Sequence, residues 1–323
     1  MTAGHLQEDI PVDTGKTKRG PLLFSGIYLT LLMICMIMIL LFQFVIPREI
    51  SAVQLADEAV PAVSAGPHVA EPPADDPQIN EVLIPKQTDS GPQITLSTIR
   101  IFDTDVHIAD IYIPDASYLR TAVANDTYGR NIKQTVAEMA EANNALLAIN
   151  GDYFGFRDGG YVIRNGVLYR EKIYDKNQED LCIWPDGNMT VIRENEISAR
   201  ELIDQGVQDV LSFGPALVVD GEIMISESLA IGPYSDDNPR TAIGMAEPLH
   251  YLFVVSDGRT DKDKGLTPYQ LAELMRDMGA QLVYNLDGGG SSTMVYEGEI
   301  INFPTARGYW EERRVSDIVY IRR

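Results

Sequence analysis

The sequence contains little cysteine and little histidine for its length. It has 2 cysteines and 4 histidines among 323 residues. Cys35 lies inside a long apolar run and Cys182 in the apolar stretch 181–184, so the part of the chain that holds Cys182 cannot form an internal disulfide. His107 and His250 stand alone on strand-like segments, and no HExxH pair occurs. These absences exclude a disulfide scaffold and the cysteine- or histidine-rich kinds of zinc site.

Basic side chains are also scarce. The chain has 26 Lys and Arg against 47 Asp and Glu, for a net charge of −21. The first 50 residues carry as many acidic as basic groups, so the excess belongs to the remainder. Such a surface repels nucleic acid and anionic lipid head groups. We therefore expect no nucleic-acid partner.

Charge is absent altogether from residues 21–46, which are apolar on every side. A bilayer core requires about 20 apolar residues in a helix, so this run predicts a single transmembrane anchor. Lys16, Lys18 and Arg19 precede it closely, whereas Arg48 beyond it is offset by Glu49. The positive-inside rule then predicts a cytoplasmic tail at 1–20 and an extracellular remainder on the cell membrane. A cleaved signal peptide is the alternative, but its apolar region would be shorter, and Ile-Ser-Ala at 50–52 matches a cleavage site weakly.

Two further regions follow the apolar run. Residues 47–93 are rich in Pro, Ala and acidic side chains without apolar periodicity, which predicts a linker. Residues 94–323 predict one strand-rich, mixed α/β (α+β) domain with helices packed on it. Asn165-Gly166 and Asp220-Gly221 each separate two β-rich arms, the typical hairpin signal. Helices are expected over residues 131–143, 198–205 and 268–278, the last beginning with a capping box.

Polar residues follow two buried strands at glycine-containing turns. The strand 145–149 leads into Asn150, Gly151 and Asp152, and the strand 281–286 leads into Asp287 and three consecutive glycines. Three adjacent glycines contribute no packing and lose backbone entropy on folding, whereas they let a backbone approach a ligand closely. No G-x-G-x-x-G opens a helix, and the Gly-Lys-Ser/Thr ending of a P-loop is missing. The sequence therefore predicts a ligand site of another kind.

Two arginines occur at strand ends in similar surroundings. Arg240 stands in the stretch 238–244 at the entry to a strand, and Arg259 follows Asp257-Gly258 at the end of the next one. Single surface arginines are usually solvated, but four strand ends here carry Asn, Asp or Arg. We expect these ends to meet at one site.

Together these segments resemble the phosphodiester glycosidase family. Five motifs stand in the family's order, and a further stretch at 314–318 resembles the family's terminal segment; the motifs are Asn150-Gly151-Asp152-Tyr153-Phe154, Phe213-Gly214-Pro215, the stretch 238–244, Asp257-Gly258-Arg259 and the stretch 287–292. The similarity runs from about residue 94 to 323. It implies a mixed α/β domain that hydrolyses a sugar-1-phosphodiester. Bacterial members with one N-terminal anchor are associated with exopolysaccharide or the cell wall, which suggests an envelope polymer as substrate.

The chemistry of that reaction assigns roles to the candidate residues. Cleavage at the sugar C1 builds positive charge on the sugar and releases a phosphate, so the site needs cations and N–H donors as well as a carboxylate. We expect Asp287 to be the carboxylate near C1, Asp152 the second carboxylate, and Arg240 a catalytic phosphate clamp. The expected substrate-binding groups are Asn150, Thr241, Arg259, Gly288, Gly289, Gly290, Ser291 and Ser292.

Two alternatives stay open at this point. Attack at phosphorus would require a divalent ion, and clustered aspartates could bind Ca²⁺ or Mg²⁺. A glycan or wall-polymer binding protein without turnover could use the same loops, with Tyr153, Phe154, Tyr309 and Trp310 stacking on sugar rings.

Overall fold

The computed structural model describes residues 20–53, 91–226, 236–306 and 308–323. The chain divides into two compact units, Met1–Ile46 and Pro47–Arg323. In the first, helix α1 (Gly20–Phe44) confirms the predicted apolar helix. Its stretch Ile27–Phe44 is long and apolar enough to cross a membrane, judged by length and composition.

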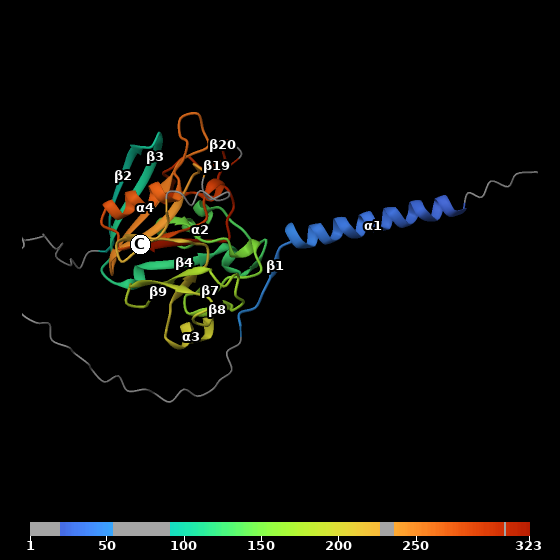
Figure 1. Ribbon diagram of the computed structural model, residues 1–323, viewed down its shortest axis with the longest axis horizontal. Helices are drawn as coiled ribbons and strands as arrows, with labels where there is room; N and C mark the ends of the chain where they lie inside the picture. Colours follow the sequence, from blue (N-terminus) through green and yellow to red (C-terminus); the bar gives the residue numbers. More distant parts are fainter. Residues whose placement is uncertain (1–19, 54–90, 227–235, 307) are drawn as a thin grey trace, which may run out of the picture. The chain divides into compact units, whose positions relative to one another are not determined.

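The second unit is strand-rich and mixed α/β, as predicted, and its strands form three larger sheets (Figure 1). One sheet has seven antiparallel strands in the order β13-β12-β16-β14-β15-β3-β2. Their bounds are Gln93–Ile101 (β2), Thr104–Tyr112 (β3), Ala216–Val219 (β12), Glu222–Ile223 (β13), Thr241–Glu247 (β14), His250–Ser256 (β15) and Leu282–Asn285 (β16). The hairpin predicted at Asp220-Gly221 joins β12 to β13.

The other two sheets each have five antiparallel strands. The order of the first is β18-β17-β6-β21-β4. Its strands are Leu119–Val123 (β4), Ala145–Asn150 (β6), Met294–Tyr296 (β17), Glu299–Ile300 (β18) and Asp317–Arg322 (β21). The order of the second is β10-β9-β11-β7-β8. Its strands are Val162–Arg164 (β7), Val167–Arg170 (β8), Glu179–Ile183 (β9), Met189–Arg193 (β10) and Asp209–Leu211 (β11).

Short elements complete the unit. Two pairs of two-residue strands are β1 (Arg48–Glu49) with β5 (Gly129–Arg130), and β19 (Thr305–Ala306) with β20 (Tyr309–Trp310). Four 3₁₀ turns are Ala116–Tyr118 (η1), Ala124–Asp126 (η2), Phe154–Phe156 (η3) and Gly289–Ser291 (η4).

The three helices described in this unit lie within the ranges that the sequence predicts, although the first begins five residues later than expected. They are α2 (Val136–Ala142), α3 (Ala199–Asp204) and α4 (Pro268–Asp277). Each begins with a capping box, in which the N-cap hydroxyl and a Glu or Gln three residues later satisfy backbone N–H groups reciprocally. Helix α4 buries Leu271, Ala272 and Met275 against β12, β13 and β16, which confirms its predicted apolar stripe as core.

The largest hydrophobic cluster takes side chains from all three large sheets, among them Ile149, Leu211, Phe253 and Tyr284. Each of these four is fully buried. The cluster holds the three sheets together, so the loops at their strand ends have fixed positions.

The start of the predicted linker differs from the remainder of that segment. The backbone of Arg48 and Glu49 pairs with β5, and the N–H of Val53 donates to the carbonyl of Leu168 at 2.8 Å. These first residues therefore belong to the second unit. Residues 54–90 lie outside the described part of the chain.

Candidate active site

The two predicted strand ends meet at the side chain of Asn150. Its Oδ1 accepts the hydroxyl of Thr241 at 2.8 Å and the N–H of Thr293 at 3.2 Å, and its Nδ2 donates to the carbonyl of Asp287 at 2.6 Å. Asn150 and Thr241 are both fully buried. The amide of Asn150 thus connects the ends of β6, β14 and β16. That Asn150 and Thr241 contact the substrate stays a prediction.

A pocket of about 520 Å³ opens above this junction. Asp152, Asp287 and Ser291 are among the residues that line it. Lys133, Tyr153 and Phe156 also line it, as do Ala306 and Glu311–Ser316 from the chain that leads into β21. The pocket therefore draws on segments of three different regions of the sequence.

Asp287 is a carboxylate of this pocket whose pKa is strongly shifted. Burial raises its pKa from 3.8 to about 6, and the negative charge of Asp152 adds to that effect. The hydroxyl of Ser291 and the positive charge of Arg313 lower it in part. Asp287 nevertheless retains some exposure to solvent, so a substrate in the pocket can reach it. A perturbed carboxyl in a cleft is typical of catalytic sites.

Two guanidinium groups lie over the glycine turn. A Cβ on Gly289 would stand 2.7 Å from Nη2 of Arg259, and a Cβ on Gly290 would stand 3.0 Å from Cζ of Arg313. Any side chain at Gly289 would displace the first group, and one at Gly290 would crowd the second. The consecutive glycines therefore make room for two arginines beside Asp287.

These two arginines feel the charge of Asp287 without forming a direct ion pair with it. Within the described ranges, neither Arg259 nor Arg313 has an ion pair; Arg259 donates to Oδ1 of Asn238 at 3.0 Å and Arg313 to Oγ of Ser291 at 3.5 Å. Burial and the positive charge of Arg313 lower the pKa of Arg259, while Asp287 raises it. Two like charges held close together favour an anion between them.

The backbone of the glycine turn contributes less than the sequence suggests. The N–H of Gly289 donates to the carbonyl of Pro239 at 2.7 Å, and those of Ser291 and Ser292 donate to carbonyls of Gly288 and Gly289. These three amides bond within the fold, and the predicted substrate contacts of Gly288, Gly289, Gly290, Ser291 and Ser292 stay predictions. A Cβ on Gly288 would stand 3.0 Å from the carbonyl oxygen of Pro239, and Ser292 is buried below the pocket.

Arg240 lies outside the residues that line the pocket. Its guanidinium donates to the carbonyls of Leu266 and Asp236 at 2.9 and 2.8 Å, and its side chain is almost fully buried. These contacts fasten the loops on either side of the strand entry. A direct catalytic role for Arg240 stays a prediction.

Asp152 lines the same pocket but is held by a buried ion network. Its Oδ2 accepts from Nη2 of Arg164 at 2.8 Å and from the N–H of Ser212 at 3.0 Å, and its Oδ1 accepts from the N–H of Phe154 at 2.7 Å. Arg164 also donates to Asp317 at 2.6 Å. Burial, followed by the charge of Asp152, raises the pKa of Asp317 to about 8.

Sequence reasoning missed Arg164 and Arg313. Arg164 lies in a hairpin arm that the sequence marks only as structural, and Arg313 directly precedes the 314–318 stretch that resembles the family's terminal segment. The adjacent Arg313-Arg314 pair before a terminal strand is the signal that was available for the second residue. No local pattern distinguishes Arg164.

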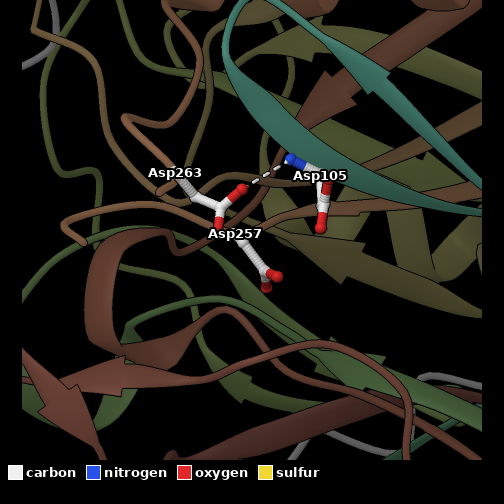
Figure 2. Close-up of side chains that lie close together, drawn as sticks. All are labelled: Asp105, Asp257 and Asp263. Carbon is white, nitrogen blue, oxygen red and sulfur yellow. Dashed lines mark hydrogen bonds between the residues drawn. The ribbon is translucent and has the colours of Figure 1, made fainter. Parts of the chain in front are cut away.

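One aspartate cluster bears on the alternative in which the protein binds Ca²⁺ or Mg²⁺. Asp105, Asp257 and Asp263 offer carboxylate oxygens within 4.8 Å of one another, and the N–H of Asp105 donates to Asp263 at 3.0 Å (Figure 2). Arg100 pairs with Asp105 and Asp263, Lys262 pairs with Asp105, and His107 contacts Asp257 at 3.3 Å. The carboxylates thus already have partners of their own, and ion binding stays the alternative that the sequence leaves open.

Comparison with known proteins identifies the family of this chain. A profile of the phosphodiester glycosidase family matches residues 143–322, and the chain belongs to that family. The match contains both strand-end turns, Arg164, Arg259 and Arg313.

Particular relatives can be named. The chain is 32% identical over 183 residues to the SPbeta prophage-derived uncharacterized protein YomE of Bacillus subtilis, covering 54% of this chain and 28% of the relative. It is 28% identical over 208 residues to the N-acetylglucosamine-1-phosphodiester alpha-N-acetylglucosaminidase of Mus musculus, covering 58% of this chain and 40% of the relative. The chain thus spans less than half the length of these curated relatives.

Solved structures share the fold. The zebrafish N-acetylglucosamine-1-phosphodiester alpha-N-acetylglucosaminidase catalytic domain, auto-inhibited by its pro-peptide, superposes with a TM-score of 0.59 at 23% identity, covering 72% of this chain and 83% of that one. A hypothetical protein from Synechocystis gives 0.55 at 14% identity, covering 72% and 62%.

Proposed function

We propose that this protein is a hydrolase that cleaves a sugar-1-phosphodiester in a cell-envelope polymer. One observation carries the proposal: a perturbed carboxyl, Asp287, shares a pocket with Arg313 and lies beside Arg259, and neither arginine has an ion pair in the described part of the chain. This arrangement matches a substrate that develops positive charge on a sugar and releases an anionic phosphate.

The two arginines would bind the phosphate. Guanidinium groups form charge-assisted, often bidentate hydrogen bonds with phosphate oxygens, and these bonds strengthen as the bond to C1 breaks and negative charge grows. Phosphate is a good leaving group without protonation, so the pocket needs no second carboxylic acid beside it. Arg259 and Arg313 therefore take the role that the sequence assigns to Arg240.

Asp287 would stand on the C1 side of the scissile bond. With a pKa of about 6 it is ionised at neutral pH, as a group must be that stabilises an oxocarbenium-like sugar or activates water. Both oxygens of Asp152 accept protein hydrogen bonds, so we propose that Asp152 holds the adjoining turn in place.

The relatives suggest which sugar to test first. The curated mammalian relative is named for its action on N-acetylglucosamine-1-phosphodiesters. N-acetylglucosamine is therefore our proposed sugar, joined through phosphate to a second unit of an envelope glycan or wall polymer.

We further propose that α1 anchors the protein in the cell membrane with the large unit outside. The helix is long and apolar enough to span a bilayer, and the basic residues Lys16, Lys18 and Arg19 precede it. Proteolysis of intact cells is expected to release the large unit. Protection of that unit from protease would contradict the proposed orientation.

The test of activity uses the full-length protein in detergent and a synthetic N-acetylglucosamine-1-phosphodiester. Wild type should release free sugar, and Asp287→Asn should lower kcat by roughly a thousandfold or more. Asp110→Asn is the matched control, because Asp110 is a partly exposed aspartate that contacts His250 outside the pocket. Similar turnover by Asp287→Asn and wild type would refute the assignment.

A binding protein without turnover remains the second candidate, since the same pocket could hold a phosphorylated glycan. The two functions separate in one assay. A wild-type protein that binds the diester in calorimetry, but releases no sugar during prolonged incubation, would be a binder.

A further inference from the structure

The paired strands β19 and β20 border the candidate active site. Strand β19 packs against the glycine turn η4, and Figure 1 shows β19 beside β20. Ala306, the last residue of β19, lines the pocket, and so does Glu311, which directly follows β20. Ala306 and Glu311 are therefore parts of the pocket wall, and the aromatic residues of β20 lie between them in the chain without lining the pocket themselves.

The register of the pair separates the two aromatic residues. Tyr309 is the cross-strand partner of Ala306, and Trp310 is the partner of Thr305. Cross-strand partners project from the same face of a sheet, and successive residues project from opposite faces. Tyr309 therefore shares the face of Ala306, which lines the pocket, whereas Trp310 shares the face of the buried Thr305.

Tyr309 has no packing role that explains it. Its side chain is 75% exposed, the largest value among the exposed large hydrophobic side chains described. An exposed aromatic ring beside a polar pocket is free to stack on a ligand that enters it.

A second aromatic surface lines the same pocket. The rings of Tyr153 and Phe156 stack with centroids 4.9 Å apart, and Tyr153 is 38% exposed. Phe154, which the sequence also suggests for stacking, is buried at 2% exposure and is excluded from such a contact. Tyr153 and Phe156 thus offer an aromatic surface inside the pocket, and Tyr309 offers an exposed ring on the strand pair that borders it.

The groups around these rings favour a carbohydrate. Lys133, Glu311 and Arg314 line the pocket among the aromatic residues. A pyranose ring offers apolar C–H faces to an aromatic ring and hydroxyl groups at its edge to charged side chains. A lipid or an apolar protein partner would require a continuous apolar surface, which these charges interrupt.

We propose that Tyr309 forms a subsite for the second sugar of the substrate, the one that lies beyond the phosphate from the cleaved sugar. This inference rests on the proposed function and extends it: the substrate is a diester between two sugars, as in a phosphate-linked glycan. Tyr309 stacks on that second ring while Arg259 and Arg313 hold the phosphate.

The experiment compares two substrates with full-length protein. One is an N-acetylglucosamine-1-phosphodiester of a second hexose, and the other is the methyl ester of N-acetylglucosamine 1-phosphate. Tyr309→Ala should raise KM for the two-sugar diester about tenfold, equivalent to about 1.4 kcal/mol, and leave the methyl ester unchanged. Tyr309→Phe keeps the ring and should behave as wild type.

Trp310→Ala is the matched control, because Trp310 belongs to the same strand but projects from its other face. Equal effects of Tyr309→Ala on both substrates, or none on either, would overturn the subsite while the proposed hydrolysis stands. Calorimetric binding of both diesters covers the case of a protein without turnover. There the proposed hydrolysis fails, and a selective tenfold loss for the two-sugar diester still supports the subsite, whereas its absence refutes it.

Discussion

The turns after β6 and β16 look alike in sequence and differ in the structure. In each, a buried strand delivers an aspartate to a glycine-containing turn. Asp152 is fully bonded to Arg164, Ser212 and Phe154, and it is 1% exposed. Asp287 retains contact with solvent and lies near two arginines that have no ion pair among the described residues.

The difference teaches that the partner's position, and not the turn itself, decides what a carboxylate does. Arg164 lies inside the protein, where its pairing with Asp152 and Asp317 serves the fold. Arg313 lies at the surface of the pocket, where it can exchange a protein contact for a substrate. The next predictions test this division between a structural and a catalytic turn.

The largest expected effect on stability comes from Arg164→Met. This change leaves Asp152 and Asp317 buried without their cation, and breaking a buried ion pair costs about 3–5 kcal/mol. The Tm of the large unit should fall by about 10 °C in thermal unfolding followed by circular dichroism. Arg313→Met should leave the Tm nearly unchanged and reduce turnover. Equal Tm losses for the two variants would contradict a structural role for Arg164 and a catalytic role for Arg313.

Much of this fold follows from local sequence signals. The capping box of α4 and the Asn-Gly and Asp-Gly hairpins require only neighbouring residues, and they are found where the sequence predicts them. Helices α2 and α3 also begin with capping boxes, which are equally local. Asn150 and Asp287 stand at the ends of β6 and β16, which belong to two different sheets, and the similar turns after the two strands are the sequence signal for their convergence. These features are therefore predictable from the amino-acid sequence alone.

The choice of arginine is not predictable in that way. Arg240 and Arg313 are both arginines near strand ends, and only the packing of distant segments turns one toward carbonyl oxygens and the other over Gly290. The role of Arg164 cannot be predicted locally either, because its partner Asp317 is 153 residues away in the sequence. Long-range contacts of this kind leave no mark within a short window of sequence.

A smaller effect is expected from Gly290→Ala. The new Cβ would stand 3.0 Å from Cζ of Arg313, so the guanidinium must shift by a few tenths of an ångström. We expect kcat/KM to fall, by about tenfold at most, since a charge-assisted hydrogen bond to phosphate is weakened. Once Arg313 is replaced by Met, the methyl group of Gly290→Ala has no guanidinium to displace. The double variant Gly290→Ala/Arg313→Met should therefore be no less active than Arg313→Met alone. Additive losses would show that Gly290 acts independently of Arg313.

The pKa of Asp287 predicts opposite effects of pH on activity and on stability. Activity should fall as the pH drops through about 6, because the carboxylate becomes protonated. Since the folded pKa lies above the unfolded value of 3.8, ionisation in the fold is unfavourable, and stability is lost as the pH rises from about 4 through 6. Asp287→Asn should therefore raise the Tm at pH 7.5 and have little effect near pH 4. A lower Tm at pH 7.5 would contradict a destabilised carboxylate.

The smallest effect is expected from a chelator. The third acidic region, Asp105 with Asp257 and Asp263, differs from the pocket because Arg100, Lys262 and His107 already compensate its carboxylates. A divalent ion would have to displace these partners, so EDTA should change neither kcat nor the Tm of the full-length protein. Loss of kcat that returns on adding Ca²⁺ or Mg²⁺ would contradict this expectation. Loss of Tm without loss of kcat would assign the ion to this cluster and a structural role, leaving the chemistry with Asp287 and its two arginines.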